Sequence, residues 1–158
     1  MTMRRMFLLI LVAVLLSSCS TYSHYDASRQ RLETLPQRHS EFDLKLAWDI
    51  RVTGDQTVID GVAKNMRYAY MHDLEISVAV LDSGGKVVAR AMTFVIPIQL
   101  RMDETAAFQV KLPVAVAPGT RLRFTYKYIG DDGGDVGLFR GGFGMNWMQS
   151  FETIVPAR

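Results

Sequence analysis

The chain has a single thiol and almost no excess charge. Cys19 is its one cysteine, so the chain cannot form an intramolecular disulfide or a cysteine-rich metal site. There are 18 basic and 16 acidic residues, and loss of a leader containing Arg4 and Arg5 leaves 16 of each sign. Such a balance gives no electrostatic basis for binding an anionic polymer. We therefore expect no nucleic-acid partner.

Catalytic motifs are also missing. The sequence contains neither Gly-x-Ser-x-Gly nor His-Glu-x-x-His. Of its three histidines, His24 and His39 precede the predicted domain, which leaves His72 alone within it. We predict a protein that is not an enzyme and holds no cofactor or metal. An acid–base pair assembled from distant residues would leave no motif, so an envelope enzyme stays open as an alternative.

No apolar run is long enough to span a bilayer comfortably. Residues 7–16 are apolar, follow Arg4 and Arg5, and lead into small polar residues. A basic start, a short apolar core and a small-residue end are the layout of a secretory signal peptide. A permanent transmembrane anchor is the alternative, and the polar residues from Ser17 onward argue against it.

The tetrad Leu16-Ser17-Ser18-Cys19 resembles the lipobox of bacterial lipoproteins. The resemblance implies that the Cys19 thiol receives a diacylglyceryl group, that residues 1–18 are removed, and that the new amine is acylated. Ser20 follows the cysteine, and the resemblance then implies sorting to the outer membrane, with the domain facing the periplasm. An ordinary signal peptide with a chance cysteine is the alternative.

Residues 19–41 are polar, with few aliphatic side chains. We predict that they form a flexible tether between the lipidated Cys19 and a domain spanning residues 42–158. A short helix over residues 26–35, ended by Pro36, is the alternative.

From Phe42 onward, apolar and polar residues alternate as in half-buried strands. Turn signals separate the runs, at Gly54-Asp55, Gly84-Gly85 and Pro118-Gly119. This pattern predicts an all-β fold, an antiparallel immunoglobulin-like β-sandwich of about seven strands, with a closed barrel as the alternative. The expected strands cover residues 44–52, 57–65, 74–80, 87–96, 108–112, 122–128 and 147–155.

Three segments resemble the FxLYD-like immunoglobulin-fold domains of bacterial envelope proteins. They are residues 59–65 (IDGVAKN), 74–82 (LEISVAVLD) and 84–88 (GGKVV), within a resemblance that covers about residues 44–128. The chain departs from that pattern by lacking a tyrosine before Asp82 and by the glycine-rich stretch from Gly130. The resemblance implies a non-catalytic binding or structural module.

If successive strands run up and down, the three longer connections emerge at one end of the sandwich. Loops on a rigid scaffold commonly carry recognition, and Tyr, Trp and Arg are enriched in interface hot spots. The alternative is that several of these aromatics cap the core. The predicted partner-binding surface consists of Arg67, Tyr68, Tyr70, His72, Phe139, Arg140, Phe143 and Trp147.

Two metal hypotheses concern the same end. Asp131, Asp132 and Asp135 could offer oxygens to calcium, but they lack the spacing and bidentate glutamate of an EF-hand. A soft metal such as Cu(I) could use thioethers, and methionine otherwise fills gaps in cores. The candidate soft-metal ligands are Met66, Met71, His72, Met145 and Met148.

Together these features predict a membrane-anchored envelope lipoprotein that acts as a binding or assembly accessory. Its expected contacts are the membrane, through the lipid on Cys19, and another envelope protein. A periplasmic copper-binding protein is the alternative.

Overall fold

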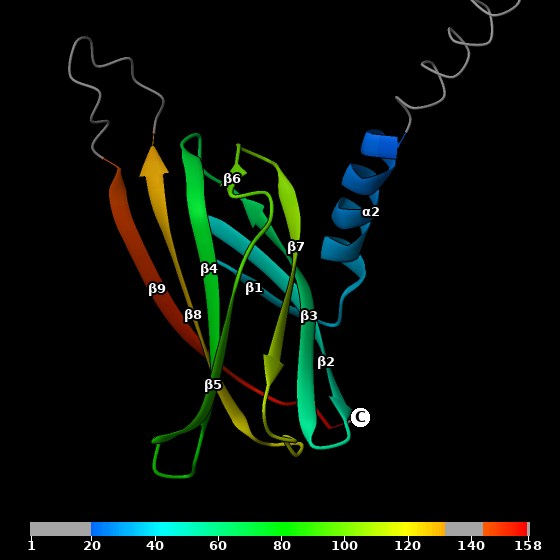
Figure 1. Ribbon diagram of the computed structural model, residues 1–158, viewed down its shortest axis with the longest axis vertical. Coiled ribbons are helices and arrows are strands. Elements are labelled where there is room, and N and C mark those ends of the chain that lie inside the picture. The colour runs from blue at the N-terminus through cyan, green and yellow to red at the C-terminus, as the bar shows by residue number, and fades with distance from the viewer. Residues whose placement is uncertain (1–19, 132–143, 158) are drawn as a thin grey trace, which may run out of the picture.

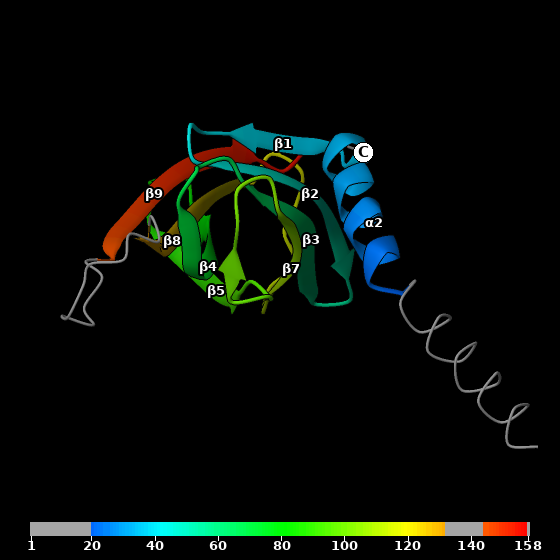
Figure 2. The same cartoon turned by 90° about the horizontal axis from the view of Figure 1, so that it is seen from above.

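The computed structural model describes residues 20–131 and 144–157, which form two antiparallel sheets and one helix. The two sheets face each other as an immunoglobulin-like β-sandwich, and they are separate rather than closed into a barrel (Figures 1 and 2). Sheet A contains β1 (Gln37–Ser40), β2 (Leu44–Thr53), β3 (Gln56–Asn65) and β7 (Thr105–Leu112). Sheet B contains β4 (Tyr70–Leu81), β5 (Val87–Phe94), β6 (Gln99–Leu100), β8 (Arg121–Asp131) and β9 (Met145–Ile154).

The alternating pattern explains the core. Along β2 the residues Leu44, Leu46, Trp48 and Ile50 are all buried, and the opposing β8 buries every second residue from Leu122 to Tyr128. The rings of Trp48 and Phe124 meet between the sheets, with centroids 4.7 Å apart. Burial of side chains this large is the main source of stability in a domain with no disulfide.

All seven predicted strands are confirmed, with ends that differ by a few residues. The sequence analysis missed two short strands. β6 has two residues and pairs with the start of β4, and β1 pairs with β2 from Gln37 opposite Trp48. Val155, expected in the last strand, lies one residue beyond β9 and bonds to the backbone of Thr120.

The flexible-tether prediction for residues 19–41 is wrong for the part that the structure describes. Residues Ser20–Thr34 form helix α2, which ends before Pro36 as the alternative interpretation proposed, and Gln37–Ser40 form β1. Helix α2 lies on the outer face of sheet A, against β2, β3 and β7 (Figures 1 and 2). The side chains of Ala47 and Val62 point outward from sheet A, yet they are almost completely buried there. An ion pair of 3.0 Å between Arg31 and Asp60 links the helix to β3.

Two ends of the sandwich can now be distinguished. The hairpin end carries the turns at Gly54, Gly85 and Gly119, all with positive φ. The loop end carries the connections β3–β4, β5–β6, β6–β7 and β8–β9, as predicted, although residues 132–143 of the last one lie outside the described residues. Helix α2 starts at the loop end, so Ser20 lies there (Figure 1). Within the described residues, no helix is long and apolar enough to cross a membrane.

Candidate binding surface

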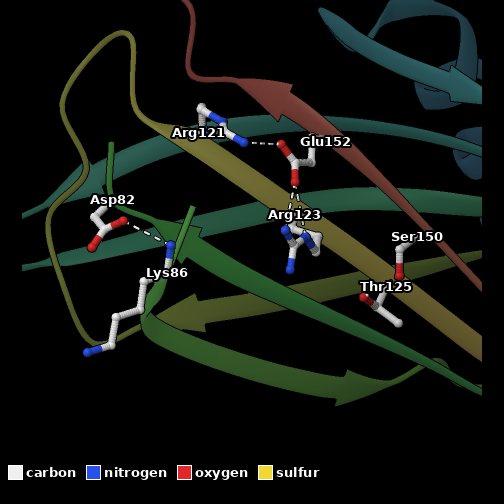
Figure 3. A network of polar contacts seen from close by, with 7 residues as sticks. All are labelled: Asp82, Lys86, Arg121, Arg123, Thr125, Ser150 and Glu152. Carbon is white, nitrogen blue, oxygen red and sulfur yellow. Dashed lines mark hydrogen bonds and ion pairs between the residues drawn. The ribbon is translucent and has the colours of Figure 1, made fainter. Parts of the chain in front are cut away.

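The outer face of sheet B has two chemically different halves. Toward the hairpin end, Glu152 on β9 accepts hydrogen bonds from Arg121 at 2.7 Å and from Arg123 at 2.8 Å (Figure 3). The two guanidinium groups, Arg121 first, lower the pKa of the Glu152 carboxyl. Next along the same strands, the hydroxyls of Thr125 and Ser150 lie 2.8 Å apart. The polar groups of this half therefore satisfy one another.

Toward the loop end, the outer face becomes apolar around one ion pair. The strand register aligns Phe94, Glu75, Lys127 and Met148 in one row across four strands. Phe94 is 54% exposed and Met148 71% exposed, whereas the Glu75 side chain is only 13% exposed. The Lys127 ammonium lies 2.8 Å from the Glu75 carboxylate. A fixed ion pair flanked by exposed apolar side chains gives a partner both burial and orientation.

This half of the face is hollowed into a shallow groove of about 400 Å³. Because the groove lies across the strands of a packed sheet, the sheet holds its lining residues in place without a ligand. Most known small-molecule sites are more enclosed than this, and so a groove open along a sheet fits an extended or protruding segment of a protein better. We call it the sheet B groove; it is lined by Asp73, Glu75, Phe94, Lys127, Tyr128, Ile129, Asn146, Trp147 and Met148.

The structure brings together some of the predicted partner-binding residues. The Arg67 guanidinium carbon lies 4.6 Å from the centre of the Trp147 ring and 5.8 Å from that of Phe42. Tyr70 and His72 lie beside each other on β4, with ring centroids 6.3 Å apart. Tyr68 is 88% exposed and contributes to neither pair.

The remaining predicted residues give a mixed outcome. Phe139, Arg140 and Phe143 lie outside the described residues, as do Asp132 and Asp135 of the calcium hypothesis. Trp147 lines the sheet B groove and also packs against the core, and its part in partner binding stays a prediction. The sequence analysis missed Phe94, Glu75, Lys127 and Ile129. Phe94 and Ile129 carried one signal, an apolar residue on the solvent face of a strand, whereas Glu75 and Lys127 look like ordinary solvent-facing charges.

A buried polar network fixes the position of the cluster formed by Arg67, Trp147 and Phe42. Asp43 is completely buried, and its two carboxylate oxygens accept hydrogen bonds of 2.8 Å from the hydroxyls of Tyr126 and Tyr128. Burial first, and then the bond to Asp43, raises the pKa of Tyr126. Burial likewise raises the pKa of Tyr128 to about 12, against an opposing effect of Arg67. Arg67 is thus positioned by a buried phenol on one side and by Trp147 on the other.

Asn65 holds the neighbouring loops. Its side-chain amide donates hydrogen bonds to the carbonyls of Ala69 at 2.8 Å and Leu100 at 3.0 Å, and its side-chain oxygen accepts one from the Arg67 N–H. The Asn65 backbone also bonds to Asp103 and Glu104. One buried side chain therefore ties the β3–β4 connection to the β6–β7 connection and keeps the Arg67 backbone in place.

The structure does not gather the proposed soft-metal ligands. Met71 is buried in the core, whereas Met148 projects from the opposite, outer face of sheet B. In the parts of the chain that the structure covers, no cluster of three or more His, Cys, Asp or Glu residues could hold a metal ion.

No protein-family model matches the chain, and no curated protein matches it in sequence. Solved structures do match its fold. The GAE domain of GGA2p from Saccharomyces cerevisiae superimposes with a TM-score of 0.50 at 11% identity, over 78% of this chain and 100% of that domain. The GAE domain of yeast GGA1 gives a TM-score of 0.47 at 8% identity, over 75% of this chain and 96% of that one. At such identities the likeness concerns the fold alone.

Proposed function

We propose that the chain is a membrane-anchored lipoprotein of the cell envelope, acting as a non-catalytic binding or assembly module for another envelope protein. The observation that supports this most is the sheet B groove, where exposed apolar side chains surround the Glu75–Lys127 ion pair. Of the three charged residues that line the groove, Glu75 and Lys127 pair with each other, and Asp73 is the third. Recognition suits such a surface better than catalysis does.

The anchoring part of the proposal rests on the lipobox-like tetrad that ends at Cys19. Acylation of the thiol would place the domain at the outer membrane, facing the periplasm. Replacing Cys19→Ser should abolish fatty-acid labelling and release the protein from the membrane fraction. Membrane retention by that variant at the parental level would contradict the lipoprotein assignment.

The binding part is tested by site-specific photo-crosslinking in the producing cell. A photoreactive phenylalanine analogue at Phe94 or Met148 should give a discrete crosslinked band with one envelope protein. Ser150 is the matched control because it projects from the same outer face, in the self-paired polar half.

A second variant distinguishes specific binding in the groove from nonspecific crosslinking. Lys127→Glu places a like charge next to Glu75 and should reduce the crosslink from Phe94 at least severalfold, while the protein stays folded and anchored. Equal crosslinking at Phe94 and Ser150, or a yield insensitive to Lys127→Glu, would rule the groove out as the partner site.

A further inference from the structure

Exposed apolar side chains gather at the loop end, beyond the sheet B groove. They come from three separate connections and from the first residue of β9, and so no single hairpin accounts for them. A large exposed apolar surface usually marks an interaction site. The members are Tyr68 (88% exposed) after β3, Ile96 (77%) and Ile98 (66%) after β5, Met102 (48%) after β6, and Met145 (58%) at the start of β9.

The chain enters the domain at this same end. Ser20 is the first residue of α2, and the helix begins at the loop end and runs down along sheet A (Figure 1). Cys19 immediately precedes this helix, so a lipid on it would be attached at the end of α2 that lies toward the loop end. Because α2 is docked against sheet A and linked by the Arg31–Asp60 ion pair, the anchor point cannot swing to the hairpin end.

We propose that the loop end lies against the lipid bilayer, with Tyr68, Ile98 and Met102 in its headgroup region. The inference rests on the proposed lipid anchor at Cys19. A lipid on Cys19, one residue before the start of α2, would hold the loop end close to the bilayer surface. Apolar and aromatic side chains held close to the bilayer insert into the boundary between headgroups and acyl chains, as those of interfacial helices do.

The charges of the loop end are compatible with a bilayer surface. The Lys64 ammonium lies 2.7 Å from the Asp103 carboxylate, and the Glu104 carboxylate accepts a hydrogen bond of 2.8 Å from the Arg101 N–H. The ion pair with Lys64 reduces the repulsion that Asp103 would exert on lipid phosphates. Arg101 is exposed in the same connection and is available to a phosphate. The groove proposed for a protein partner lies elsewhere, on the outer face of sheet B.

The experiment uses the full lipoprotein in vesicles of phosphatidylethanolamine and phosphatidylglycerol. A cysteine is introduced at Tyr68→Cys, Ile98→Cys or Met102→Cys and carries an environment-sensitive fluorophore. Val88→Cys is the matched control, since Val88 is 60% exposed and follows the turn at the hairpin end. Spin-labelled lipids should quench the loop-end probes at least threefold more than the control, with a blue-shifted emission. Quenching no greater than at Val88 would overturn the inference.

The parent chain separates this outcome from failure of the anchor. Cys19 is its one thiol, so lipidated parent protein should take up almost no fluorophore. Stoichiometric labelling of the parent would show a free Cys19, and both the lipoprotein proposal and the bilayer contact would fall. If the parent takes up no fluorophore and the loop-end probes are not quenched, the bilayer contact is refuted and the lipoprotein proposal stands.

Discussion

The hydroxyl of Tyr126 donates a hydrogen bond of 2.8 Å to the Asp43 carboxylate, which lies 83 positions earlier in the chain. Tyr126 belongs to sheet B, and Asp43 immediately precedes β2 of sheet A, so this bond joins the two layers near the loop end. With the Tyr128 hydroxyl on its second oxygen, Asp43 has an acceptor role that no apolar residue can fill.

Replacing Asp43→Leu should therefore destabilise the domain. Two buried phenol hydroxyls lose their acceptor, and each unsatisfied buried polar group costs about 1–3 kcal/mol. We expect a fall of about 3 kcal/mol in the free energy of unfolding, measured by urea denaturation. In the Asp43→Leu background, adding Tyr126→Phe should cost little or even restore stability, because one orphaned hydroxyl is removed. An additive loss in the double variant would contradict the coupling.

The two tyrosines that bind Asp43 also predict how the free energy of unfolding depends on alkaline pH. Tyr128 in the folded chain has a pKa of about 12, and an unfolded tyrosine has one of about 10. Below pH ~10 both states keep the proton and stability is unaffected. Between pH ~10 and ~12 the unfolded state alone loses it, so stability should fall as the pH rises.

The measurement is a series of urea denaturations between pH 8 and 11.5. Tyr126→Phe/Tyr128→Phe should start from a lower stability but lose less of it above pH 10, because the titrating groups are gone. Parallel curves for the parent and this variant would show that the two phenols do not carry the effect.

Gly61 should tolerate no side chain. A Cβ built there would lie 2.5 Å from the Phe108 ring and 2.5 Å from the Ala47 carbonyl oxygen. Overpacking of this kind costs about 1–3 kcal/mol, so Gly61→Ala should lower the thermal midpoint by several degrees. At Gly84 the nearest atom is a flexible Asp82 carboxylate at 3.4 Å, so Gly84→Ala should leave the midpoint nearly unchanged. Equal midpoints for the two variants would refute the steric argument.

Val62 should hold helix α2 on sheet A. Its side chain is completely buried on the outer face of the sheet, and deleting two methyl groups from such a site costs about 2 kcal/mol. In Val62→Ala, the α2 amides should exchange with deuterium faster than in the parent. Val52→Ala is the control because Val52 is 49% exposed near a turn, and exchange in α2 should not respond to it.

The fold was predictable from the sequence because apolar and polar residues alternate along half-buried strands with a period of two. Leu44, Leu46, Trp48 and Ile50 face one layer, and the pattern requires no knowledge of their partners. Helix α2 was not predictable in the same way, since it is polar and its burial depends on Ala47 and Val62 in other elements. Two apolar residues on the solvent face of adjacent strands were the available sign of a covering helix.

The candidate surface was predictable only in part for a related reason. Aromatic residues such as Trp147, which packs against Arg67, stand out in the sequence, whereas the groove arises from the alignment of neighbouring strands. Glu75 meets Lys127, and Phe94 flanks them, only once β4, β5 and β8 are aligned. The alternation that begins at Phe42 predicts a solvated Asp43, but Asp43 lies just before β2, where alternation no longer applies, and it is buried.

Helix α2 also bears on stoichiometry. Because it occupies the centre of the outer face of sheet A, the broad face of sheet B is the one that stays accessible within residues 20–131 and 144–157. A partner that docks broadside onto a sheet therefore has one place per copy. On the proposed function, complexes should therefore saturate at one partner for each copy of the protein, rather than growing into chains of alternating subunits.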